Sequence, residues 1–233
     1  MSAGKSLLGM FVALSVAGQA SAATLSLSES TFAGWSIEAI VGNPGFQTGS
    51  QQPDGGNTGG NPDPFWQVTT TTNELVYSMS SGPGLEVDPS VSGAILSMDV
   101  SFDFRPISAF GDGHAFGLAL QQDGRFFYAI TGVSGSQFSD WQNESQAGLL
   151  AANFVAPNGG TLDFSEAGGP IRVGLLTANQ GGAGITIGYD NFVVTVNVDD
   201  PPDRVPEPAL GVLFALAGLS AAGVGALRRR QQG

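Results

Sequence analysis

Residues 94–104 read Ala-Ile-Leu-Ser-Met-Asp-Val-Ser-Phe-Asp-Phe and give the strongest strand pattern of the 233-residue chain. Successive side chains of a β-strand point to opposite faces. One face therefore carries Ile95, Ser97, Asp99, Ser101 and Asp103, and the other carries Leu96, Met98, Val100, Phe102 and Phe104. A strand with one polar and one apolar face is typical of a sheet that packs on a second sheet.

Further strand patterns lie on both sides of this one. We expect strands at residues 24–28, 35–41, 66–72, 75–79, 115–121, 125–131, 149–155, 171–177 and 185–198. Asp123-Gly124 predicts a hairpin turn, whereas Asn73-Glu74 allows either a hairpin or one bent strand. Residues 43–64 hold six glycines and four prolines and predict an exposed loop. The pattern predicts an all-β, antiparallel β-sandwich of jelly-roll type over residues 23–198.

The first 22 residues have the features of a signal peptide. Lys5 precedes a short apolar run at residues 7–16, and Ala20-Ser21-Ala22 provides small residues before Ala23. The apolar run is too short to span a bilayer. We therefore expect signal peptidase to cleave between Ala22 and Ala23 and the protein to be exported.

The C-terminal region predicts a membrane anchor. An acidic, proline-rich linker at residues 199–205 precedes 19 uncharged residues, 209–227, which are just long enough to span a bilayer as a helix. Arg228, Arg229 and Arg230 follow, and the positive-inside rule places them in the cytoplasm. The body of the protein would then lie on the far side of the membrane.

The order of features in this tail resembles the PEP-CTERM sorting signal of exopolysaccharide-producing Gram-negative bacteria. The resemblance covers Val205 to Arg230 and rests on Val205, Pro206, Glu207, Pro208, the apolar span and the terminal arginines, so the sorting signal is expected at residues 206–233. It implies that an exosortase-type membrane protease cleaves near this motif and delivers the protein to the cell surface or the extracellular matrix. The alternative is that the prolines only separate the linker from the helix.

Charge limits the partners of the predicted mature protein. Four of the eight basic residues and one of the 20 acidic residues lie outside residues 23–205, which leaves that body with four arginines, 19 carboxylates and a formal charge of −15. Such a surface repels phosphates and attracts divalent cations, so we expect no nucleic-acid partner. The chain has no cysteine, which excludes disulfides and thiolate chemistry.

A second resemblance concerns the body. Phe32-Ala33-Gly34-Trp35, Gly59-Gly60-Asn61-Pro62 and Tyr189-Asp190-Asn191-Phe192 look like parts of the laminin-IV-type and carbohydrate-binding jelly rolls of bacterial surface proteins. The resemblance implies a structural calcium ion held by an acid of the last strand and an acid near the N-terminus. Asp190 and Glu38 are the nearest counterparts, and carboxylates are suitable calcium ligands.

Catalytic patterns are weak. His114 is the only histidine, so a site with several histidine ligands is excluded. A triad with Asp112 would need an activated serine, but the chain has no Gly-x-Ser-x-Gly motif. Asp99 and Asp103 share a polar strand face and are the only basis for a glycosidase alternative. We predict no enzyme.

Aromatic residues suggest a binding function. Trp66, Trp141, Tyr128 and Phe127 are candidates for stacking on sugar rings, whereas Trp35 lies in an alternating apolar pattern and is expected in the core. We expect an exported structural or exopolysaccharide-associated protein. A carbohydrate-binding module is the alternative function, and a glycoside hydrolase is a third hypothesis.

Overall fold

The computed structural model describes residues 22–57, 60, 62–71, 74–108, 114–134, 140–179 and 184–199. The first of its two sheets contains β1 (Ala23–Glu29), β3 (Gln47–Gln52), β4 (Phe65–Thr70), β7 (Ile95–Ser108), β10 (Gln142–Leu149) and β12 (Ile185–Val198). The second contains β2 (Ser36–Val41), β5 (Val76–Ser81), β6 (Glu86–Val87), β8 (His114–Gln122), β9 (Arg125–Ser134) and β11 (Ile171–Asn179). Short helical turns occur at η1 (Pro44–Phe46), α1 (Pro89–Ser92) and η2 (Ala151–Asn153).

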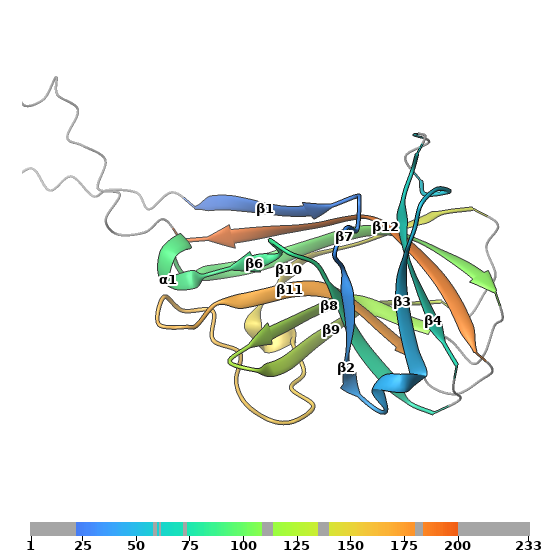
Figure 1. Ribbon diagram of the computed structural model, residues 1–233. Coiled ribbons are helices and arrows are strands. Elements are labelled where there is room, and N and C mark those ends of the chain that lie inside the picture. Colours follow the sequence, from blue (N-terminus) through green and yellow to red (C-terminus); the bar gives the residue numbers. More distant parts are fainter. Residues whose placement is uncertain are drawn as a thin grey trace, which may run out of the picture.

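The two sheets form an antiparallel sandwich (Figure 1). The strand order is β10-β7-β12-β4-β3 in the first sheet, where β1 also pairs with β12. In the second sheet it is β2-β5-β11-β8-β9, where β6 also pairs with β11. This architecture confirms the predicted all-β sandwich and is consistent with a jelly roll.

The alternation along β7 is confirmed over most of its length. Met98, Val100 and Phe102 are at most 2% exposed and lie in the core between the sheets. The start of the strand differs from the prediction, because Ile95 is buried and Leu96 is 46% exposed. The pairing with β12 has an irregularity here, which shifts the side-chain alternation by one residue.

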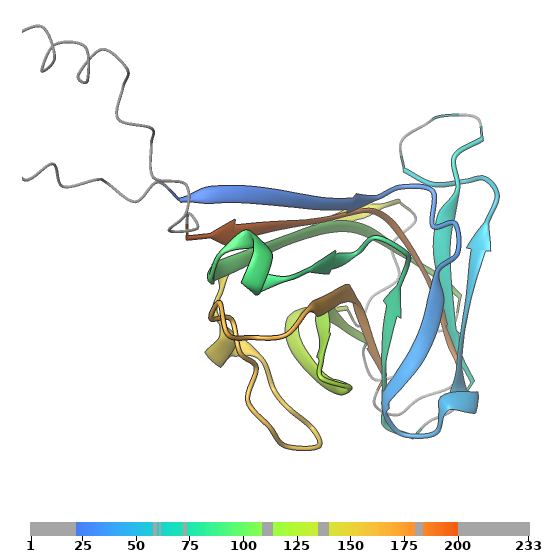
Figure 2. The same cartoon turned by 60° about the vertical axis from the view of Figure 1, so that its left-hand side comes forward.

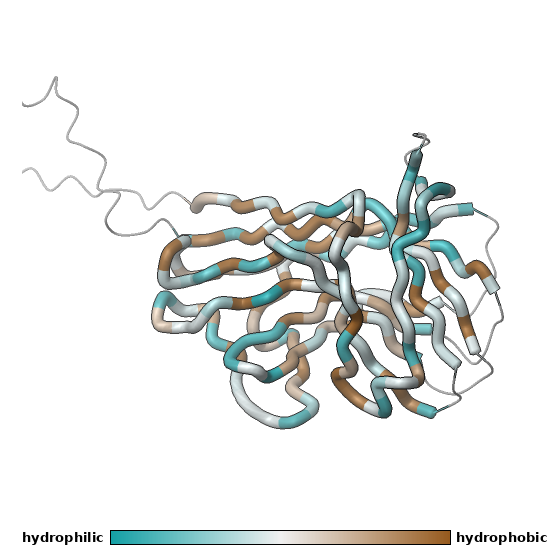
Figure 3. Tube along the Cα trace, in the orientation of Figure 1, coloured by the Kyte–Doolittle hydropathy of each residue, from teal (hydrophilic) through white to brown (hydrophobic). Residues whose placement is uncertain are grey.

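Both sheets contribute to one large core. Apolar residues recur along the facing strands (Figure 3), and most of them belong to this cluster. Phe102 of the first sheet contacts Phe116 of the second edge to face, with ring centroids 5.6 Å apart. Burial of these apolar side chains, aromatic and aliphatic, holds the sheets together.

The hairpin at Asp123-Gly124 is confirmed, and it joins β8 to β9. Both residues have positive φ angles, +52° and +72°, as a tight type I′ turn requires. The connection at Asn73-Glu74 was predicted to form a hairpin or one bent strand, and both alternatives are wrong. β4 lies in the first sheet and β5 in the second, so the chain crosses between the sheets here.

Two other segments differ from the prediction. Residues 47–52, expected in a loop, form edge strand β3 and pair with β4. The polar sequence of these residues lacks the apolar alternation that indicates a strand. The strand forms nevertheless, because pairing uses backbone hydrogen bonds, which need no apolar face. Residues 149–155 do not form a strand; β10 ends at Leu149, η2 follows, and Val155 makes one isolated bridge to Tyr128.

The two ends of the described domain lie together. Ala23 of β1 pairs with Val198 of β12, and both views show these ends side by side (Figures 1 and 2). Ala20, the signal-peptide residues before it, the sorting motif Val205 to Pro208, the expected span 209–227 and the terminal arginines lie outside the described residues. Among the residues that are described, no helix is long and apolar enough to cross a membrane.

Candidate functional site

Two of the predicted sugar contacts are core residues. Trp66 and Phe127 are each 2% exposed, so their rings cannot stack on a ligand at the surface. Trp66 lies 5.7 Å from the ring of Trp35, which is also in the core as expected. The prediction for Trp66 is wrong because the strand that carries it turns this residue toward the opposite sheet.

Trp141 is half-buried and already has partners on the protein. Its ring contacts Phe65 edge to face at 5.5 Å. The guanidinium carbon of Arg105 lies 4.8 Å from the ring centroid, within the range of a cation–π contact. These contacts explain the position of Trp141 without a ligand.

Tyr128 differs from the other candidates because it lies on the outer face of the second sheet. Its neighbours Phe127 and Ala129 point into the main core, so Tyr128 points away from it. The ring stands edge to face against that of Tyr77, with centroids 5.0 Å apart. Both tyrosines are half-buried. Sequence reasoning missed Tyr77, because it lies 51 positions away and on a strand that is not adjacent.

The two rings meet across the outer face of the strands that lie between them. β5 and β9 are separated by β11 and β8, which corresponds to about 14 Å between the outer backbones. The tyrosines pack on a second apolar cluster formed by Ile40, Met79, Ala119 and Leu176. Burial, together with the neighbouring Tyr77, raises the pKa of Tyr128, so its hydroxyl stays protonated at neutral pH.

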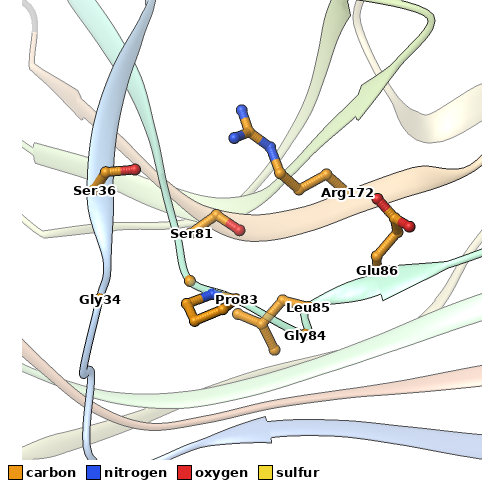
Figure 4. Close-up of a pocket in the computed structure, with 9 residues that line it drawn as sticks. Gly34, Ser36, Ser81, Pro83, Gly84, Leu85, Glu86 and Arg172 are labelled. Carbon is orange, nitrogen blue, oxygen red and sulfur yellow. The ribbon is translucent and has the colours of Figure 1, made fainter.

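A polar pocket opens at the β2, β5 and β6 side of the second sheet (Figure 4). Its volume is about 370 Å³, and its lining comprises Gly34, Ser36, Ser81, Gly82, Pro83, Gly84, Leu85, Glu86 and Arg172. Figure 4 shows the side chains of Arg172 and Ser36 directed toward each other. An Nη atom of Arg172 lies 2.5 Å from a carboxylate oxygen of Glu38.

Glu38 and Asp190 do not form the predicted calcium site. Glu38 is paired with Arg172 in the second sheet, whereas Asp190 belongs to the first. The carboxylate of Asp190 accepts backbone N–H groups of Asn57 and Asn191 at 2.6 and 2.7 Å. The predicted pairing is therefore wrong, because the two acids belong to different sheets and each carboxylate already has its own partners.

Asp190 instead lies in an acidic cluster with Asp63 and Asp103. All three are less than 10% exposed. Burial raises the pKa of Asp190, and the nearby Asp63 and Asp103 add to this rise, while backbone N–H groups oppose it. Within the described part of the chain, no three acidic, histidine or cysteine side chains are arranged to hold a metal ion. Calcium binding at Asp190 stays a prediction.

The catalytic alternatives find little geometric support. Asp99 and Asp103 lie four residues apart on β7, which corresponds to about 13 Å along a strand, beyond the roughly 5–10 Å between the carboxylates of glycosidases. His114 is 1% exposed, and its Nε2 lies 2.5 Å from the hydroxyl of Tyr189. Asp112 lies outside the described residues.

Comparisons with known proteins do not assign a family. No protein-family model matches the chain. No curated protein matches it either. Similar solved structures include the CBM22-1 and GH10 modules of a Clostridium thermocellum xylanase, crystallised with xylohexaose, with a TM-score of 0.43, 9% identity, and 73% of this chain and 28% of that chain covered.

Two further structures show the same level of similarity. An arabinose-bound α-L-arabinofuranosidase gives a TM-score of 0.43 and 19% identity over 71% of this chain and 23% of that chain. The family 11 carbohydrate-binding module of Clostridium thermocellum, in complex with a β-1,3-1,4-mixed-linked tetrasaccharide, gives a TM-score of 0.42 and 15% identity. The match covers 75% of this chain and 96% of that chain. This chain thus spans less than a third of the two enzyme chains. Similarity at this level establishes neither a ligand nor an activity, and the fold assignment rests on the strand pairing described above.

Proposed function

We propose that this domain binds a neutral glycan on the outer face of its second sheet, with Tyr77 and Tyr128 as the aromatic contacts. The observation that carries the proposal is the half-buried tyrosine pair, which packs on a cluster of buried apolar residues on the outer face of the sheet. Tyrosine combines a flat ring, which can pack on the C–H face of a sugar, with a hydroxyl that can hydrogen-bond to it. The sequence favours a structural role, and this geometry supports the carbohydrate-binding alternative better.

The acidic character of the domain favours an uncharged polysaccharide. Residues 23–205 carry a formal charge of −15, which repels acidic polymers. Burial raises the pKa of Tyr128, so this contact residue adds no charge at pH 7.

Affinity electrophoresis tests the proposal. We expect the protein to be retarded in native gels by at least one of mixed-linkage β-glucan, xylan or galactomannan, and not by alginate. Tyr128→Ala should weaken binding about tenfold, because loss of a central aromatic contact costs roughly 1.4 kcal/mol or more. Tyr128→Phe keeps the ring and should retain most of the binding.

Leu96→Ala is the control, since Leu96 is an exposed side chain on the first sheet. It should migrate as the wild type does in every gel. If a Tyr77→Ala/Tyr128→Ala double variant is retarded as strongly as the wild type, the proposed surface is wrong. If no neutral polysaccharide retards the wild type, the glycan-binding function itself is wrong.

We further propose that the protein reaches the cell surface through both of its targeting segments, with signal peptidase and an exosortase-type protease as processing partners. The pairing of Ala23 with Val198 supports this. Two membrane-linked segments attached at these residues would leave the domain from the same end. The domain could then fold on the outer side of the membrane while both segments remain inserted.

Intact-mass measurement of the protein from cells and medium tests this sorting route. We expect a species that begins at Ala23 and ends near Pro206. Replacing Pro206, Glu207 and Pro208 with alanine should leave the tail uncleaved, because the rigid recognition element is lost. An Arg230-containing tail in the wild-type protein as well would contradict the exosortase proposal, and the domain would then be permanently anchored.

A further inference from the structure

The pocket beside Arg172 results from an interruption in the second sheet. β5 and β6 pair with the same edge of β11, at residues 175–179 and 171–172 respectively. Between them the chain leaves the sheet as a turn at residues 82–85. Two hydrogen bonds fix this turn: the hydroxyl of Ser81 donates to the carbonyl of Val173, and the N–H of Val173 donates to the carbonyl of Leu85. The pocket is therefore held by the backbone of the sheet.

Gly82 keeps this turn in place. A Cβ atom at residue 82 would collide with the indole ring of Trp35, which belongs to the main core. The turn therefore lies directly on the core, and the pocket floor has a rigid support. Such a preformed cavity loses little conformational entropy when a ligand enters it.

The guanidinium of Arg172 provides hydrogen-bond donors at this pocket. Its side chain is 31% exposed, and one Nη atom is bound to Glu38. The Nε atom has no acceptor on the protein, but it is buried and out of reach of a ligand. A ligand oxygen would therefore be bound by the Nη groups, which carry more N–H bonds than the ion pair with Glu38 uses.

The charges at the pocket select the kind of ligand. One guanidinium is accompanied by two carboxylates, Glu38 and Glu86, so the local charge is negative and a phosphate or carboxylate is disfavoured. The guanidinium of Arg172 donates hydrogen bonds and the neighbouring carboxylates accept them. This combination suits the hydroxyl groups of a ligand, because a hydroxyl both donates and accepts. Pro83 and Leu85 add an apolar wall that suits the C–H face of a sugar ring.

We infer that this pocket is a second subsite, which takes one uncharged sugar unit of a glycan chain through the Arg172–Glu38 pair and Ser36. The inference rests on the proposed glycan-binding function and extends it to a ligand of several sugar units. It also assigns to Arg172 and Glu38 a binding role in addition to their ion pair.

The positions of the two subsites fit one chain. Gly174 pairs with Ala119, and Ala119 pairs with Tyr128, so these residues form one outward row next to Arg172. Arg172 and Tyr128 lie two strands and two residues apart, which corresponds to about 12 Å between their backbones. Gly174 and Ala119 lie between them, and the buried side chain of Met79 packs beside Gly174. A short oligosaccharide that reaches both subsites would therefore cross this apolar strip.

Calorimetric titration with gluco-, xylo- and manno-oligosaccharides of two to six units tests the inference. For at least one series, we expect the wild-type affinity to rise about tenfold or more with length, as the second subsite is reached. Arg172→Gln should remove this rise and leave disaccharide binding unchanged. Arg172→Lys keeps the charge but loses the forked donor geometry, so it should behave like Arg172→Gln. Oligogalacturonates of the same lengths should bind at least tenfold more weakly.

Arg105→Gln is the matched control, because it removes the same charge from the first sheet. It should bind every oligosaccharide as the wild type does. A direct readout avoids any folding defect of the variants: the guanidinium N–H resonances of Arg172 in the wild type should shift on titration with the hexasaccharides.

The outcomes separate the two proposals. If Tyr128→Ala loses binding while the Arg172 variants keep the full rise with length, the second subsite is wrong and the glycan-binding surface stands. An unchanged Arg172 resonance at saturation would also overturn the subsite. Equal binding of neutral and uronic oligosaccharides would overturn its ligand class. If the wild type binds none of these sugars, both proposals fail.

Discussion

Replacing Phe102 with alanine is expected to lower the free energy of unfolding by about 3–5 kcal/mol. Phe102 is fully buried and contacts Phe116 and Tyr189, at centroid distances of 5.6 and 6.0 Å. Phe116 belongs to the opposite sheet, so the cavity would lie at the interface that holds the sandwich together. Paired β-strands cannot move inward easily to fill it.

Urea-induced unfolding at constant pH measures this effect, provided that the slope of the transition is unchanged. Leu96→Ala on the same strand is the control, because Leu96 is 46% exposed. We expect a loss of less than about 1 kcal/mol for this variant. Equal losses for Phe102→Ala and Leu96→Ala would contradict the assignment of the two faces of β7.

Acidification is expected to destabilise the protein through His114. Burial lowers the pKa of His114 from 6.5 to about 3, and its Nε2 is hydrogen-bonded to the hydroxyl of Tyr189. Below pH 6.5 the unfolded chain takes up a proton that the folded protein excludes. Stability is therefore complete above pH 6.5 and falls as the pH decreases, by about 1.4 kcal/mol per pH unit until the folded histidine also titrates.

The free energy of unfolding at pH 7.5 and pH 5.0 measures this contribution. We expect a decrease of about 2 kcal/mol in the wild type over this interval. The His114→Gln variant cannot take up the proton and should lose most of the difference, whatever its own stability. Tyr189→Phe should keep the difference, because burial, and not the hydroxyl, causes the shift. The same decrease in His114→Gln would show that another group is responsible.

Asp190 acts in the opposite direction. Its pKa is raised in the folded protein, so protonation at low pH favours the folded state. The stability linked to this shift is present at low pH and is lost as the pH rises through the folded pKa. The His114→Gln variant keeps Asp190, so the comparison of this variant with the wild type isolates the effect of the histidine.

The strand pattern alone predicted the fold class because it is a local property. The alternation of polar and apolar residues along 98–104 shows which face of the strand is buried, and Asp123-Gly124 shows where the chain reverses direction. Both signals depend on neighbouring residues only. The same logic failed at β3, whose polar residues pair through the backbone, and at Ile95, where a strand irregularity reverses the alternation.

Composition and periodicity were enough to predict an acidic, cysteine-free β-sandwich with one buried face per main strand, because both are properties of the linear chain. Which aromatic residues remain at the surface depends on the tertiary structure. It buried Trp66, brought Tyr77 to Tyr128 and placed Arg172 beside Glu38. These contacts join positions up to 134 residues apart, and their formation depends on strand order and register, which local alternation does not specify.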